Sequence, residues 1–180
     1  MGSAVARACA AHRHEPGTGS AERVGFQLQQ TWATDAEGNM TSIDKWEFPD
    51  ELYYTQDHNW ARVEGNLVTV GMTQFAQDLA GEIVYVEVPR VGRQVARGEP
   101  FMSMESGKWV GRVKSPVSGK LVEANGELEW ESTTVNQDPY GAGWLAKIEI
   151  AGPEALEGLR KANSPEFAAF IAEQRSKYNK

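Results

Sequence analysis

Residues 101–113 read FMSMESGKWVGRV, and the turn sequence SPVSG follows at residues 115–119. Stretches rich in β-forming residues lie on both sides of Lys108, so the pattern places this lysine near the tip of a hairpin. An exposed lysine held at a tight turn is what a ligase requires in order to attach a swinging cofactor. The sequence therefore predicts a carrier, which presents a tethered group to other enzymes, rather than a catalyst with its own pocket.

The composition limits the classes of partner. The chain has 180 residues, of which 41% are hydrophobic, and this size suits one domain with extensions. Its net charge is -7 and no basic cluster stands out, which argues against nucleic acid and anionic membrane and favours partners with basic docking surfaces. Cys9 is the single cysteine, so the fold does not depend on an oxidising compartment. With neither a membrane-spanning run nor a convincing secretory signal, the sequence predicts a cytoplasmic protein.

The chain divides into four segments. Residues 1–39 have few branched apolar residues and no sustained periodicity, which predicts a disordered extension or an artefact upstream of a true start at Met40. Residues 40–51 are interpreted as a lead-in segment, and residues 52–150 as the carrier domain. Residues 151–180 are expected to form a C-terminal helical extension that packs on this domain.

Short strands separated by turns dominate the carrier domain. Clear β runs are LVTVGM at residues 67–72, IVYVEV at residues 83–88 and WLAKIEI at residues 144–150. The last of these alternates apolar and polar positions, as a half-buried strand does. Frequent Gly and Pro turns between such strands predict a mainly β fold, either a sandwich or a small flattened barrel.

Helices are expected at two places. Thr73 is positioned to cap a short internal helix that Gly81 ends. Beyond residue 153 the pattern is helical, and Pro165 occupies a favoured first position of a helix. These C-terminal helices are predicted to pack on the sandwich.

A series of motifs in register resembles the glycine cleavage system H protein family of lipoyl carriers, over about residues 52–170. The motifs are YTQDHNW at 54–60, VGMT at 70–73, GEIVYVEVP at 81–89, GEPF at 98–101, ESGK at 105–108, SPVSG at 115–119 and NQDPYGAGWL at 136–145. The resemblance implies a hammerhead-like sandwich of the lipoyl/biotinyl type, with lipoate in amide linkage on Lys108. The dithiolane of lipoate opens by thiolate attack or reductive transfer, and tethering raises its effective concentration at each partner.

Biotin carriers share this kind of hairpin, but they normally place methionine on both sides of the modified lysine. Here the neighbours are Gly107 and Trp109, and Glu105 lies three residues before the lysine, as in lipoyl H-like proteins. The resemblance therefore favours lipoate over biotin. It also implies that Glu105, with Ser106 and Gly107, belongs to the hairpin that a lipoate-attaching enzyme recognises.

Around the predicted arm the chain departs from the family pattern. The departures are Asn59 in place of glutamate, Phe75 in place of histidine, Gly111-Arg112 in place of Ser-Asp, and Gly107 and Trp109 in place of valine and alanine. A protonated aminomethyl load is cationic, and Arg112 would repel it while Asn59 offers no charge. Phe75 and Trp109 would instead give the dithiolane apolar cover. These changes favour an anionic load, such as an oxidised sulfur group.

The favoured interpretation is the branch of H-like lipoate-binding proteins of sulfur-oxidising prokaryotes. Such a carrier would move sulfur intermediates to a cytoplasmic heterodisulfide-reductase-like complex. The alternative is the glycine cleavage shuttle, whose partners decarboxylate glycine, transfer the methylene group and reoxidise the arm, the last by a dihydrolipoamide dehydrogenase. In either case a monomer is expected from the family.

An autonomous enzyme is the third possibility. The histidines are His12, His14 and His58, and the first two lie in the doubtful N-terminal segment. No histidine-based triad or metal cluster is visible in this pattern, and paired acid/base carboxylates cannot be identified. His58 is interpreted as a structural residue near Trp60, and the protein as a carrier that is not itself an enzyme.

Overall fold

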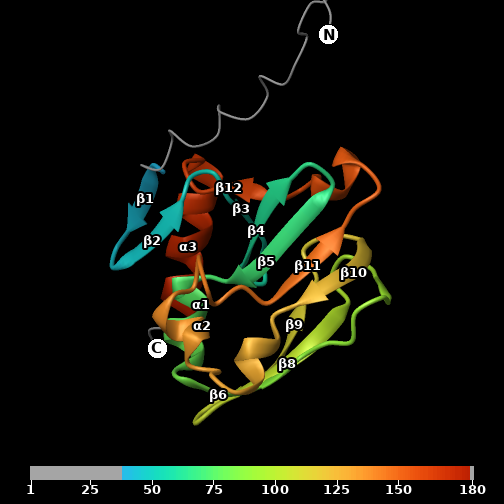
Figure 1. Ribbon diagram of the computed structural model, residues 1–180. Helices are drawn as coiled ribbons and strands as arrows, with labels where there is room; N and C mark the ends of the chain where they lie inside the picture. Colours follow the sequence, from blue (N-terminus) through green and yellow to red (C-terminus); the bar gives the residue numbers. More distant parts are fainter. Residues whose placement is uncertain (1–37, 179–180) are drawn as a thin grey trace, which may run out of the picture. The chain divides into compact units, whose positions relative to one another are not determined.

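The computed structural model describes residues 38–178. The predicted disordered extension lies, apart from residues 38 and 39, outside the described residues, as do Cys9, His12 and His14. Figure 1 shows a mainly β arrangement with few helices. The boundaries proposed for the four segments stay predictions.

Two sheets form the main body of the described part. The larger is a seven-stranded antiparallel sheet in the order β12-β3-β4-β5-β11-β10-β7, and the smaller is a three-stranded sheet in the order β6-β8-β9. The strands of the larger sheet are β3 (Tyr53–Tyr54), β4 (Asn59–Glu64), β5 (Leu67–Met72), β7 (Gln94–Val95), β10 (Gly119–Ala124), β11 (Ala146–Glu149) and β12 (Arg160–Lys161). Those of the smaller sheet are β6 (Ile83–Glu87), β8 (Pro100–Ser106) and β9 (Val110–Lys114).

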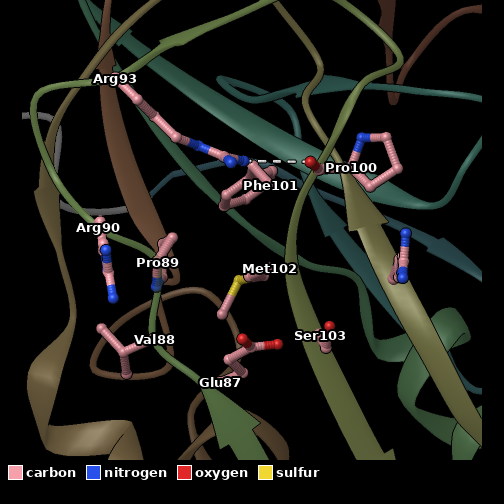
Figure 2. Close-up of a pocket in the computed structure, with 10 residues that line it drawn as sticks. Glu87, Val88, Pro89, Arg90, Arg93, Pro100, Phe101, Met102 and Ser103 are labelled. Atoms are coloured by element: carbon pink, nitrogen blue, oxygen red, sulfur yellow. Dashed lines mark hydrogen bonds between the residues drawn. The ribbon is translucent and has the colours of Figure 1, made fainter.

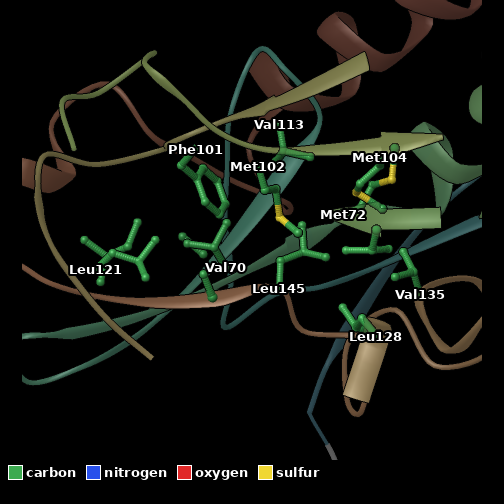
Figure 3. Close-up of a cluster of buried hydrophobic side chains, with 14 of the residues drawn as sticks. Val70, Met72, Phe101, Met102, Met104, Val113, Leu121, Leu128, Val135 and Leu145 are labelled. Atoms are coloured by element: carbon green, nitrogen blue, oxygen red, sulfur yellow. The ribbon is translucent and has the colours of Figure 1, made fainter. Parts of the chain in front are cut away.

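The main core lies between these two sheets. Val70 of β5 and Leu121 of β10 share it with Met102 and Met104 of β8 and with Val113 of β9 (Figure 3). Burying side chains of this size contributes about 1.5–3 kcal/mol each. The predicted mainly β, sandwich-like fold is confirmed.

Short helical segments connect or flank the strands. They are α1 (Gln74–Ala80), η1 (Gly126–Glu129), α2 (Thr134–Gln137), η2 (Pro153–Leu156) and α3 (Pro165–Tyr178). The predicted ends of α1 are confirmed, since the Thr73 hydroxyl accepts from the Ala76 N–H and the Gly81 N–H donates to the Gln77 carbonyl. Residues 160–161, expected to be helical, instead form β12 beside β3, because Gly158 adopts a φ of 75° and ends the preceding turn. No helix in residues 38–178 is long and apolar enough to cross a membrane.

A second buried group, which we call the aromatic cluster, joins the N-terminal hairpin to α3. The hairpin consists of β1 (Met40–Ile43) and β2 (Trp46–Pro49), which pair antiparallel. The aromatic cluster comprises Trp46, Phe48, Leu52, Tyr54, Trp60, Phe75, Ala162, Phe167 and Ile171. Trp46 and Phe48 therefore pack with the rest of the described chain, although they precede the resemblance that begins near residue 52.

Candidate functional site

Lys108 lies in the turn between β8 and β9, and its side chain is exposed. The Ser106 N–H donates to the Trp109 carbonyl at 2.7 Å and closes the turn around the lysine. The Ser106 hydroxyl donates to the buried Ala80 carbonyl at 2.6 Å and also accepts from the Lys108 N–H at 3.3 Å. One serine therefore holds the lysine turn and fastens it to the last turn of α1.

Gly81 supports the stem of the lysine side chain. A Cβ atom at this position would lie 2.9 Å from Cε of Lys108, and the backbone φ of 89° disfavours any other residue. The Asn136 side chain fixes the same segment, since its amide donates to the Gly81 carbonyl at 3.1 Å and its oxygen accepts from the Ile83 N–H at 2.9 Å. The lysine stem thus crosses a segment of backbone that Asn136 holds by two hydrogen bonds.

Trp109 and Gly111 form a matched pair in the hairpin. The indole of Trp109 is partly buried against the main core and covers Gly111, where a Cβ atom would overlap Cζ2 of the ring. The sequence predicts that Trp109 shields the dithiolane with its apolar ring, and this role stays a prediction. What the structure adds is a reason for two departures from the family pattern, because the large ring at 109 requires the small residue at 111.

A hollow of about 710 Å³ opens beside the lysine. It is lined by Lys45, Trp46, Gln74, Gln77, Asp78, Gly81, Glu82, Lys108 and Asn136. Asp78 forms an ion pair with Lys45 at 2.9 Å, whereas Glu82 has no ion-pair partner among residues 38–178. The indole N–H of Trp46 is buried with no hydrogen-bond partner in the described part of the chain. We call this region the lysine hollow.

Sequence reasoning missed most of the lysine hollow. One signal was present, because residues 74, 77, 78 and 81 recur at helical spacing and so share a face of α1. Lys45 and Asn136 come from distant parts of the chain, and no local pattern connects them to Lys108. Only folding brings these polar side chains together.

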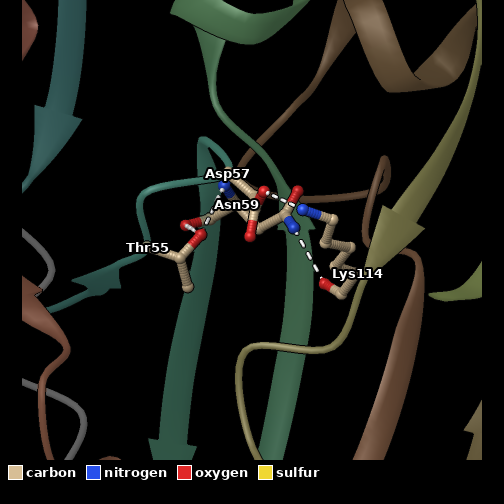
Figure 4. Close-up of polar contacts among 4 residues, drawn as sticks. All are labelled: Thr55, Asp57, Asn59 and Lys114. Atoms are coloured by element: carbon tan, nitrogen blue, oxygen red, sulfur yellow. Dashed lines mark hydrogen bonds and ion pairs between the residues drawn. The ribbon is translucent and has the colours of Figure 1, made fainter. Parts of the chain in front are cut away.

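Asn59 does not line the lysine hollow. Its side chain is 4% exposed, and its amide donates to the Lys114 carbonyl at 2.9 Å (Figure 4). Its backbone N–H donates to the hydroxyl of Thr55, and the Lys114 ammonium pairs with Asp57 at 2.8 Å. Asn59 therefore links β4 to the end of β9, and we correct the expectation that it contacts the arm.

Phe75 and His58 lie in or against the aromatic cluster. Phe75 is 0% exposed and packs at 4.7 Å from both the Trp46 and the His58 rings, so it has no surface to offer the arm. His58 also stacks on Phe170 at 5.2 Å. Burial lowers the pKa of His58 from 6.5 to about 4, against the opposing effects of Asp57 and Gln174. The apolar cover expected from Phe75 is corrected to a packing role, and the ring of His58 packs against Phe75 and Phe170 rather than lining the lysine hollow.

Arg112 lines a different hollow. Its side chain is exposed on β9, opposite Ser103 of β8, and borders a hollow of about 440 Å³ that also includes Arg90 and Arg93. Figure 2 shows Arg90 and Arg93 on the segment after β6, with Arg93 extended toward the Pro100 carbonyl. The sequence predicted no basic cluster, because these arginines are brought together only by strand pairing and the connecting turn. We call this second region the arginine hollow.

Comparisons with known proteins agree with the fold and the hairpin. The family model described as Glycine cleavage H-protein matches residues 52–172. The Glycine cleavage system H protein of Myxococcus xanthus (strain DK1622) is 48% identical over 114 residues, which are 63% of this chain and 88% of that relative. The protein of the same name from Anaeromyxobacter sp. (strain K) is 44% identical over 128 residues, 71% of this chain and 98% of that relative.

A solved structure is similar over the same part of the chain. The crystal structure of a glycine cleavage system H protein from Mycobacterium marinum superposes with a TM-score of 0.61 at 33% identity, covering 72% of this chain and 99% of that one. The chain therefore belongs to the glycine cleavage H-protein family, whose members are non-catalytic carriers with lipoate attached covalently to a lysine.

Proposed function

We propose that this protein is the lipoyl carrier of a glycine cleavage system and that Lys108 bears the lipoate. The observation that carries the proposal is the exposed lysine at the β8–β9 turn, with its stem across Gly81 and the lysine hollow beside it. The ammonium of Lys108 has no ion-pair partner among residues 38–178, so nothing described there competes with its modification. Lipoate supplies a dithiolane that accepts and releases the transferred group.

The charges near Lys108 suit an aminomethyl load. A protonated aminomethyl group is cationic, and the carboxylates of Asp78 and Glu82 line the lysine hollow. An ion pair at such an exposed position contributes about 0.2–1 kcal/mol. Because Asp78 already pairs with Lys45, Glu82 is the carboxylate best placed to favour the load.

The residues around the lysine then have separate tasks. Ser106 holds the turn in place, and Gly81 lets the lysine stem cross without obstruction. Trp109 anchors the returning strand on the main core. The carrier supplies tethering and orientation, and the partners that decarboxylate glycine, transfer the methylene group and reoxidise the arm supply the catalysis.

Transport of sulfur intermediates to a heterodisulfide-reductase-like complex is the second candidate. In its favour, Asn59, Phe75 and Arg112 stand where the family pattern has glutamate, histidine and aspartate. Against it, none of these residues lines the lysine hollow, and the named relatives are glycine cleavage H proteins. The cytoplasmic location and the monomeric state stay predictions under either candidate.

A parallel loading experiment distinguishes the two candidates. The lipoylated protein is incubated either with glycine and glycine decarboxylase or with a thiosulfate-type sulfur donor and its cognate transfer enzymes, and the intact mass is measured. A mass gain from glycine, released by the methylene-transferring enzyme, supports the glycine cleavage assignment. A gain from the sulfur donor alone would overturn it in favour of the sulfur candidate.

A further inference from the structure

The three-stranded sheet β6-β8-β9 buries one face in the main core and exposes the other. Cross-strand register aligns Tyr85 with Glu105 and Val110, and, further from the lysine turn, Glu87 with Ser103 and Arg112. We call this exposed surface the outer hairpin face, defined by Tyr85, Glu87, Ser103, Glu105, Val110 and Arg112. It continues directly into the turn that carries Lys108.

In the row nearest the lysine, two exposed apolar side chains flank the carboxylate of Glu105. Tyr85 is 49% exposed and Val110 is 71% exposed. Val110 is separated from Lys108 by a single residue, so this apolar pair lies beside the turn. A partner that encloses the turn would also cover Tyr85 and Val110, which would remove both side chains from water.

The next row leads into the arginine hollow. This hollow is lined by three arginine side chains and by one carboxylate, that of Glu87, although the whole chain carries a net charge of -7. Among residues 38–178, no carboxylate forms an ion pair with Arg90, Arg93 or Arg112. Arg93 donates to the Pro100 carbonyl at 3.1 Å (Figure 2), whereas the side chains of Arg90 and Arg112 donate to no acceptor among residues 38–178. At the arginine hollow the charge therefore suits a partner that presents carboxylates, whereas the neighbouring row nearer the lysine carries the carboxylate of Glu105.

The distance from the lysine indicates which partner must cover this surface. Arg112 follows Lys108 by four residues, which corresponds to about 13 Å at about 3.3 Å per strand residue. A typical protein interface covers about 800 Å² on each partner, which is a patch of roughly 16 Å radius. An enzyme that acts on the lysine nitrogen itself must enclose the turn, and its footprint then extends to Arg112. Enzymes that react with the far end of the lipoyl arm can do so without covering this surface.

We propose that the outer hairpin face, together with Arg90, is the docking surface for the enzyme that attaches lipoate. That enzyme presents carboxylates to Arg90 and Arg112 and an apolar patch to Tyr85 and Val110. The inference rests on Lys108 being the attachment residue, but it does not depend on which load the finished arm carries.

The test measures attachment to the unmodified protein. The probe is a purified ATP-dependent lipoate–protein ligase, supplied with lipoate and ATP, so that lipoyl adenylate forms before transfer. The lysine nitrogen then bonds to the lipoyl carboxyl carbon, the bond from that carbon to the phosphate oxygen of AMP breaks, and AMP and a proton leave. Initial rates are measured against the concentration of the carrier.

Charge reversal separates docking from chemistry. Arg112→Glu and Arg90→Glu are each expected to raise the KM for the carrier by about tenfold at low salt while leaving kcat within about twofold, because charges at the rim of an interface act mainly on encounter. The difference from the wild type should shrink in 0.5 M NaCl, a concentration at which the screening length is only a few ångströms. Lys120→Glu on β10 is the matched control, with the same change of charge at an exposed strand position and no ion pair to lose among residues 38–178.

Several outcomes would overturn the inference. A KM for Arg112→Glu and Arg90→Glu equal to that of Lys120→Glu would do so, as would a fall in kcat with KM unchanged. A wild-type dimer that Arg112→Glu converts to a monomer would assign the face to self-association instead. Circular dichroism verifies folding, and Arg90→Glu, in a connecting turn, keeps the test decisive if Arg112→Glu fails to fold. Because no glycine is used, failure of the glycine cleavage assignment would leave these rates unchanged.

Discussion

The lysine hairpin, which consists of β8, β9 and the turn that carries Lys108, differs from the aromatic cluster in how its polar groups are used. In and around the aromatic cluster, the Tyr54 hydroxyl donates to the Pro49 carbonyl at 2.8 Å and the Trp60 indole donates to the Pro139 carbonyl at 2.9 Å. Around the hairpin, Glu82, Lys108 and Arg112 form no ion pair with any part of residues 38–178. In the first region these two side chains hold the fold together, although the indole N–H of Trp46 has no partner among residues 38–178. In the second region the charged groups stay available for a cofactor, a load or a partner.

This contrast explains why position in a family motif does not by itself identify an arm contact. Asn59 and Phe75 occupy motif positions, yet Asn59 is buried between β4 and the end of β9, and Phe75 is buried in the aromatic cluster. The following changes test the division between the two regions, in decreasing order of expected effect.

Phe75→Ala should have the largest effect on stability and little effect on the site. Removing a fully buried phenylalanine ring is expected to lower the free energy of unfolding by about 3–5 kcal/mol, because a cavity remains in the aromatic cluster. Denaturant titration measures this loss, with Val84→Ala at an exposed position as the control. If lipoylation or loading were lost while stability stayed unchanged, Phe75 would be an arm contact and the division would be wrong.

Gly111→Val should disturb the hairpin through Trp109. The added side chain overlaps the indole, and such overpacking is expected to cost about 1–3 kcal/mol. Trp109→Ala alone should also destabilise, but the double variant should recover more than about 0.5 kcal/mol relative to the sum of the single effects. Strictly additive losses in thermal unfolding would show that the two positions are not matched.

Lowering the pH should lower the free energy of unfolding through the protonation of His58. Its pKa of about 4 in the folded state lies below the ordinary 6.5, so the unfolded chain takes up the proton first as the pH falls. The stabilising contribution is complete above pH 6.5 and is lost between pH 6.5 and 4, at a slope of at most about 1.4 kcal/mol per pH unit. Denaturant titrations across this range should show a steeper loss for the wild type than for His58→Gln. Parallel profiles for the two proteins would exclude this origin of the acid sensitivity.

Glu82→Gln should have the smallest effect, and only on the load. Exposed ion pairs contribute about 0.2–1 kcal/mol, so the extent of aminomethyl loading from glycine should fall by at most about fivefold at low salt. Glu129→Gln, exposed in η1, is the control for loss of one negative charge. Equal loading of both variants and the wild type would remove the electrostatic argument for a cationic load.

Local patterns in the sequence were sufficient to predict the sandwich, the capped helix α1 and the turn at Lys108. Alternation along the strands, the Thr73 cap and the Gly81 stop act over a few residues, so sequence reasoning reaches them. The division of roles around the arm was beyond such reasoning. Trp46, which the sequence places in a lead-in segment, packs on Phe75. Only the folded structure shows that this packing removes Phe75 from the surface and so from the arm.

The two hollows illustrate the same limit. The lysine hollow combines Lys45, the polar face of α1 and Asn136, and the arginine hollow combines a connecting turn with β9. Neither assembly has a sequence spacing of its own, because each depends on contacts between distant segments. The sequence shows the charge of Arg112, but it does not show that this side chain lines the arginine hollow rather than the lysine hollow.

The most direct test of the account is peptide mapping of the protein after production with lipoate and the cognate attaching enzyme, alongside Lys108→Arg. The account predicts one lipoyl mass increment on the wild-type peptide that contains Lys108, and no increment on the Lys108→Arg protein. An unmodified Lys108 under conditions in which the enzyme lipoylates another known carrier, or lipoate on a different lysine, would contradict the assignment of the site.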